Sequence, residues 1–92
     1  MKAFDDVPGA EIISAGLRDL TAGVESVPSV LVSIGAPRLR RLGIAVPSVE
    51  PNPEHRLYRL LLARHGDAAH GRYNALVRRL VSFERALENL GL

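Results

Sequence analysis

The fold is decided by residues 67–90, which read DAAHGRYNALVRRLVSFERALENL. Apolar side chains recur in this stretch every seven residues, in the two rows Tyr73, Leu80, Leu87 and Leu76, Phe83, Leu90. The rows are offset by three residues, so both fall on one face of an α-helix. The pattern predicts a long amphipathic helix over residues 67–90. Its apolar face, called the seam below, is expected to pack against other helices.

Glu84 breaks the apolar pattern in the middle of the seam. A carboxylate buried without a partner costs more free energy than a small domain can supply. Three interpretations remain open: the cation of Arg56, Arg59 or Arg64 meets it, the face is partly wet, or a partner protein supplies the cation. An internal pair is the ordinary solution, because buried charges are normally paired. Glu88, one turn further on, would allow both acids to hold one arginine of a partner.

Composition sets the broad class. Ninety-two residues predict one domain, 1–92, and 47% hydrophobic with 24% charged residues predict a globular chain. The absence of cysteine excludes disulfides and thiolate zinc sites. The longest uninterrupted apolar run is Leu60–Ala63, far below the roughly 20 residues that cross a bilayer. The first residues do not resemble a secretory signal. We therefore expect a cytoplasmic protein without a membrane segment.

Glycine and proline residues mark the expected boundaries between elements in the rest of the chain. Residues 1–8 are expected to form a loose lead-in and residues 43–53 a proline-rich connector, with Asn52 and Asp67 as helix N-caps. The predicted helices are 9–22, 26–35, a short one over 37–42, 53–65 and the final 67–90. The segment 26–35 stays open between helix and strand, because its composition suits a strand whereas its spacing favours a helix.

Together these elements predict an all-α fold, a small helical bundle of four main helices plus one short helix. The short break near Gly66 predicts that the last two helices form an αα-hairpin. This C-terminal hairpin is expected to be the core, which the first two main helices cover.

Catalytic signatures are missing from the sequence. There is no nucleophile elbow, phosphate-binding loop or dinucleotide fingerprint, and no HExxH zinc motif. His65, Asp67 and His70 lie close together in the sequence, but a metal site needs three or four convergent ligands. A metal or small-molecule site there is the weakest hypothesis. We expect no enzyme, no catalytic residue, no metal and no cofactor.

The leading functional prediction is a non-enzymatic protein-interaction module. It would be a small regulatory or antitoxin-like subunit that binds a partner protein, or a second copy of itself as an oligomer, through the amphipathic helix. The residues predicted to contact the partner are Tyr73, Val77, Leu80, Glu84, Leu87 and Glu88.

The alternative prediction is nucleic-acid binding through arginine-rich helical faces. Eleven of the twelve basic residues are arginines, and they concentrate in the second half of the chain. A high genomic GC content explains the arginine content equally well, but it does not explain the position. The residues predicted for this alternative are Arg38, Arg40, Arg41, Arg78 and Arg85.

Overall fold

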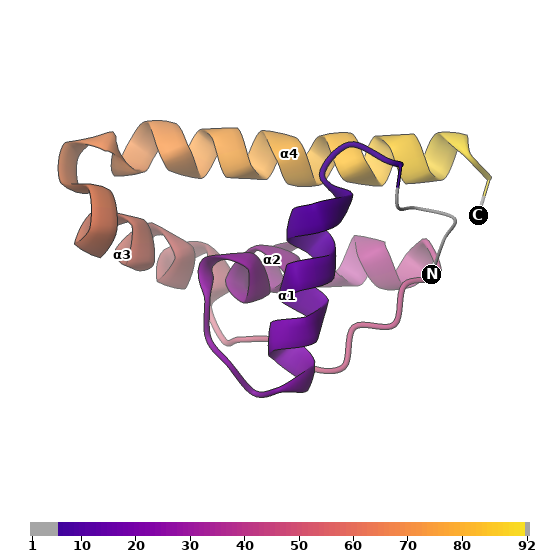
Figure 1. Cartoon of the computed structure of the whole chain (residues 1–92), viewed down its shortest axis with the longest axis horizontal. Coiled ribbons are helices and arrows are strands. Elements are labelled where there is room, and N and C mark those ends of the chain that lie inside the picture. Colours follow the sequence, from indigo (N-terminus) through magenta and orange to yellow (C-terminus); the bar gives the residue numbers. More distant parts are fainter. Residues whose placement is uncertain (1–5, 92) are drawn as a thin grey trace.

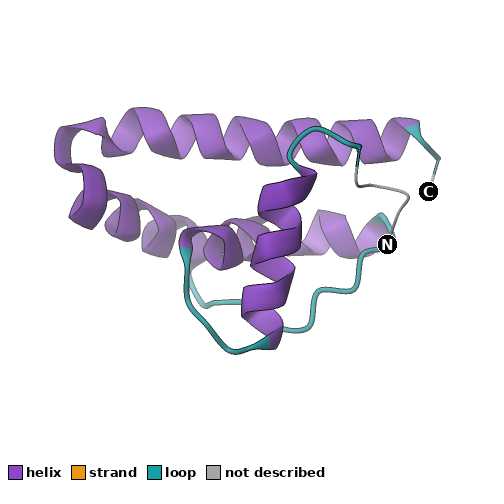
Figure 2. Cartoon of the chain, viewed as in Figure 1, coloured by secondary structure: helices purple, strands orange, loops and turns teal. Residues whose placement is uncertain are grey.

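The structure is a computed structural model that describes residues 6–91, and every regular element in them is a helix (Figure 2). Three uninterrupted helical stretches cover 10–21, 27–41 and 53–89. The first two are α1 (Ala10–Thr21) and α2 (Val27–Arg41). The third bends at a 3-10 turn, η1 (Gly66–Ala68), which separates α3 (Pro53–His65) from α4 (Ala69–Asn89). The all-α class is confirmed, whereas four main helices plus a short one is wrong.

The short helix predicted over 37–42 is the end of α2, which continues through Pro37 to Arg41. A proline inside a helix removes a backbone hydrogen bond and costs about 3 kcal/mol. Ala36 and Leu39 on either side of it are only 1% and 0% exposed. Burial of one leucine side chain contributes about 1.5–3 kcal/mol. Packing therefore offsets the proline and keeps the helix continuous.

The start of α2 settles the question of helix or strand in favour of the helix. The Ser26 hydroxyl accepts a hydrogen bond from the Ser29 amide at 3.1 Å, and the Ser29 hydroxyl accepts one from the Ser26 amide at 2.8 Å. This reciprocal capping box satisfies two amides that a helix start leaves unpaired. Pro28 follows in the first turn, where its missing N–H is no loss.

The centre of the fold is α2 and not the C-terminal hairpin, which corrects the prediction. α1, α3 and α4 each pack against α2, and Figure 1 shows α1 crossing α2 while α3 and α4 fold back on each other at η1. Residues Val30 to Ser33 are all buried, so α2 buries side chains on every side. The hairpin forms as predicted, but it cannot close a core alone and its seam packs against α2.

Two glycines allow helices to approach α2 closely. A Cβ atom on Gly16 would lie 2.4 Å from the Pro28 carbonyl oxygen and 2.5 Å from Cγ2 of Val32. A Cβ atom on Gly35 would lie 2.8 Å from Cδ1 of Leu80 on α4. The first contact brings the backbone of α1 against that of α2, and the second brings α4 against α2.

The connector over 43–53 is tied to the body of the protein, as expected. Ile44 and Val46 are buried, whereas Val49 is 47% exposed. The Glu50 amide donates a hydrogen bond to the Ser33 hydroxyl at 3.0 Å. That hydroxyl in turn donates to the Ser29 carbonyl oxygen at 2.9 Å. A buried serine of α2 therefore holds the connector in place.

The remaining sequence predictions concern the lead-in and the caps. Residues 1–5 of the lead-in over 1–8 lie outside the described residues. Asn52 precedes α3 with a left-handed φ of 49° and makes no side-chain cap, and Asp67 lies inside η1 rather than at the start of α4. Asn52 therefore occupies the predicted N-cap position with Pro53 after it, although its side chain makes no capping hydrogen bond, whereas the N-cap predicted at Asp67 is wrong. Across residues 6–91, no helix is long and apolar enough to cross a membrane.

Candidate functional site

The centre of the seam lies inside the protein, whereas Leu90 at its end is 55% exposed. Leu80 and Leu87 are 3% and 1% exposed, and Phe83 between them is fully buried. Tyr73 packs on Tyr58 of α3 with ring centroids 5.9 Å apart. Six residues were predicted to contact a partner. Three of them are buried (Leu80, Glu84 and Leu87), two are half-buried (Tyr73 and Val77), and Glu88 is exposed. Most of this set thus packs within the chain.

Glu84 is 4% exposed, and its cation comes from the end of α2. Oε1 of Glu84 lies 3.7 Å from Nη1 of Arg38, while Nη2 of Arg38 donates to Oε1 of Glu88 at 3.1 Å. One arginine therefore holds both acids, as predicted for an arginine of a partner. The internal candidates Arg56, Arg59 and Arg64 were wrong. Prediction of one continuous helix over 27–41 would have made Arg38 a candidate partner of Glu84.

The surroundings of Glu84 oppose its ionisation. Burial raises the pKa of the Glu84 carboxyl group, while the charges of Arg38 and Arg41 act in the opposite direction. A Cβ atom on Gly35 would lie 2.9 Å from Oε2 of Glu84, so α2 packs directly on the carboxylate. This cluster is a device that fixes α4 against α2.

The five arginines of the nucleic-acid alternative have different surroundings. Arg38 holds the two acids, and Arg40 donates to the Val46 carbonyl oxygen at 3.0 Å. Arg41, Arg78 and Arg85 are exposed. The last two are seven residues apart in α4, so they lie on one outward face.

A groove of about 310 Å³ lies between α3, α4 and the start of α2, and is called the α3–α4 groove. Its apolar lining is Val27, Leu61, Ala75 and Leu76, and its basic lining is Arg64, His65, Arg72 and Arg79. Among residues 6–91, no acidic residue lines it. One acid lies near it, because Arg79 pairs with Glu11 of α1. The groove could not be predicted from the sequence, because its residues come from three helices.

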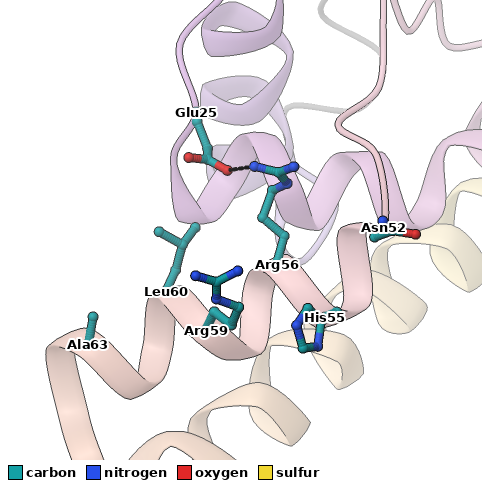
Figure 3. Close-up of a pocket in the computed structure, with 7 residues that line it drawn as sticks. All are labelled: Glu25, Asn52, His55, Arg56, Arg59, Leu60 and Ala63. Atoms are coloured by element: carbon teal, nitrogen blue, oxygen red, sulfur yellow. Dashed lines mark hydrogen bonds and ion pairs between the residues drawn. The ribbon is translucent and has the colours of Figure 1, made fainter.

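A second depression of about 380 Å³, called the α3 cleft, lies between Glu25 and the first turns of α3 (Figure 3). Nη1 of Arg56 donates to Oε2 of Glu25 at 2.7 Å, and Nε of Arg56 donates to the Pro51 carbonyl oxygen at 3.1 Å. The hydrogen bond to Glu25 raises the pKa of Arg56. Its complete lining is Glu25, Asn52, His55, Arg56, Arg59, Leu60 and Ala63.

Metal-ligating side chains do not converge in the described part of the chain, where no group of three or more could hold an ion. His70 instead contacts the Nδ2 atom of Asn74 at 3.3 Å, one turn along α4. His65 lines the α3–α4 groove, and Asp67 is exposed in η1. The three residues of the weakest hypothesis therefore form no metal site in the structure.

Comparison with known proteins gives no relative from which a role can be transferred. No protein-family model matches the chain, and no curated protein or solved structure matches it either.

Proposed function

We propose that this protein is a non-enzymatic interaction module that binds an acidic segment of a partner protein in the α3–α4 groove. The supporting observation is the lining of the groove, in which three arginines, one of them paired with Glu11, and a histidine surround an apolar floor, with no acid among the described lining residues. A regulatory or antitoxin-like subunit of the cytoplasm belongs to the same proposal. We propose the groove rather than the seam as the contact surface, because Leu80 and Leu87 of the seam are buried.

The chemistry of the groove favours a protein partner over a small ion. Leu61 is buried and Leu76 is half-buried, so the floor offers an apolar anchor point to one or two side chains. Arg64 and Arg72 are exposed at the rim, where guanidinium groups bind carboxylates with two parallel hydrogen bonds. A groove of this size is only an anchor, because stable interfaces bury about 1,200–2,000 Å² in total. The partner must therefore also contact surface outside the groove.

The test places a photo-crosslinking amino acid at Ala75, which is exposed in the groove, and in a second variant at Ala45, which is exposed in the connector and does not line the groove. Both are expressed in the native cell, and crosslinked proteins are identified by mass spectrometry. We expect one protein crosslinked from position 75 and not from position 45. That protein is then purified and titrated against the chain.

Charge reversal supplies the matched comparison in the titration. Arg72→Glu at the groove should weaken binding at least tenfold, whereas Arg78→Glu on the outward face should leave affinity within twofold. An equal effect of both substitutions, or equal crosslinking from both positions, would refute the groove. Light scattering of the purified chain separates binding of a second copy from binding of another protein.

Nucleic-acid binding is the second candidate. It is supported by Arg78 and Arg85, which are exposed on one face of α4 and have no ion pair among residues 6–91. Contacts to phosphates would make affinity fall steeply with salt. A gel shift at low ionic strength with the parent chain, and its loss in the double variant Arg78→Gln/Arg85→Gln, would support this candidate. Absence of any shift at low salt would remove it.

A further inference from the structure

The α3 cleft is separate from the α3–α4 groove, because the two share no lining residue. Figure 3 shows Arg56, Arg59 and Leu60 extending from α3 toward the side on which Glu25 lies. The volume of about 380 Å³ is in the range of small-ligand sites, which begin at about 300 Å³. The cleft is therefore large enough to hold a small molecule.

One basic side chain of the cleft is already positioned. Arg56 uses Nη1 for Glu25 and Nε for the Pro51 carbonyl oxygen, so its guanidinium plane is fixed by two hydrogen bonds from different parts of the chain. Its second terminal nitrogen, Nη2, makes neither of these bonds. A ligand would meet a donor held in place before binding, which reduces the entropy lost on association.

Two further donors of the cleft have no partner in the part of the chain that the structure describes. Neither His55 nor Arg59 makes a hydrogen bond or an ion pair among residues 6–91. They are four residues apart on α3, so they share one side of the helix. Arg59 alone offers five N–H donors, and the imidazole adds one more.

The charge of the lining is positive even after the internal pair is counted. Arg56 and Arg59 contribute two positive charges, and Glu25 is the one acid among the lining residues that the structure describes, while Glu50 lies outside the lining but near enough for its charge to act on Arg56. The N–H donors of Arg56, Arg59 and His55 outnumber the two oxygens of one carboxylate, and the lining carries more positive than negative charge. A phosphate monoester has three terminal oxygens and a charge of about −1.5 to −2 at neutral pH. Leu60 and Ala63 add an apolar wall for an organic group.

We propose that the α3 cleft binds a small phosphomonoester. Its phosphate lies between Nη2 of Arg56, the guanidinium of Arg59 and the imidazole of His55, and its organic part lies on Leu60 and Ala63. The site is independent of the proposed partner groove, and a ligand in it would also bridge α3 to the segment that carries Glu25.

The test is a titration of the ¹⁵N-labelled chain with phenyl phosphate, inorganic phosphate and benzoate, followed by amide chemical shifts. Phenyl phosphate should give saturable shifts in the first turns of α3, inorganic phosphate should bind more weakly, and benzoate should bind weakest. Absence of saturable shifts with phenyl phosphate would overturn the proposal. Benzoate binding as tightly as phenyl phosphate would overturn the assignment to a phosphate.

Variants locate the site. Arg59→Gln should weaken phenyl phosphate at least tenfold, and Arg78→Gln, an exposed arginine on α4, should leave binding unchanged. Ala63→Leu keeps every charge but reduces the space beside the apolar wall, so it should weaken the binding of phenyl phosphate more than that of inorganic phosphate. Circular dichroism checks that each variant remains folded. An unchanged affinity in Arg59→Gln, or equal losses in Arg59→Gln and Arg78→Gln, would refute the cleft as the site.

Discussion

Substitution of Gly16 by alanine tests the close crossing of α1 on α2. The new methyl group would lie 2.4 Å from the Pro28 carbonyl oxygen, whereas ordinary contact begins at 3.4 Å. α1 would have to move outward by about 1 Å, because a backbone oxygen cannot rotate away as a side chain can. Such overpacking typically costs about 1–3 kcal/mol and occasionally more. Alanine regains about 1 kcal/mol over glycine inside a helix. Because the clash is with rigid backbone, the upper end of this cost applies, and after subtraction of the helix gain we expect the free energy of unfolding to fall by about 2 kcal/mol.

The same substitution at Gly71 is the matched control. Gly71 lies in α4, is exposed, and has no atom within 4 Å of the added Cβ. Only the helix preference remains, so Gly71→Ala should raise the free energy of unfolding by about 0.5–1 kcal/mol.

Urea denaturation followed by far-UV circular dichroism measures both glycine variants against the parent chain. In a domain of this size each 1 kcal/mol corresponds to about 4–8 °C in Tm, so thermal unfolding gives an independent check. A Gly16→Ala variant as stable as the parent, or a shift of both variants in the same direction, would refute the close crossing.

Three other predictions use the same measurements. Phe83→Ala should lower the free energy of unfolding by about 3–5 kcal/mol, because Phe83 is 0% exposed; a loss below about 1 kcal/mol would contradict its place in the core. Burial raises the pKa of the Glu84 carboxyl group above its unfolded-state value of 4.5. Between these two values the folded state binds more protons than the unfolded state, so the stability of the parent chain falls as the pH rises. Glu84→Gln should abolish this slope in urea denaturation between pH 4.5 and neutrality; an unchanged slope would contradict the cause assigned here. Burial, and then the charge of Glu54, raises the pKa of Tyr73 above 10.0, so ultraviolet titration of a Tyr58→Phe variant, which retains only this phenol, should give a midpoint above that value; a midpoint at or below it would show that the ring is solvated.

The seam could be predicted because one helix carries the whole signal. Its period is local, and Leu80, Phe83 and Leu87 are buried as that period requires. What covers the seam could not be predicted, because that depends on which helix has side chains to bury on all sides. Val30–Ser33 in α2 supply that surface.

The prediction of the cation that meets Glu84 was wrong because it treated Pro37 as a helix boundary. Pro37 is a reasonable boundary by local rules, and it placed Arg38 on a separate short helix. Burial of Leu39 overrides that rule and extends α2, which carries Arg38 to the carboxylate. Local preference lost here to tertiary packing.

The two candidate binding surfaces differ in how visible they are in the sequence. His55, Arg56 and Arg59 already form a polar strip on one predicted helix, so half of the α3 cleft could be seen. Glu25, which fixes Arg56, comes from a distant loop and could not be seen. The α3–α4 groove had no signal, because its floor and rim are brought together only by the fold.

The hydroxyl of Ser33 has a consequence for amide exchange with solvent. The Glu50 amide belongs to a loop, and loop amides usually exchange quickly because water reaches them directly. Here the proton is shared with a hydroxyl buried in the central helix, at 3.0 Å. This proton should leave only when the loop lifts away from α2, so its protection reports the opening of the connector rather than the fraying of its own backbone.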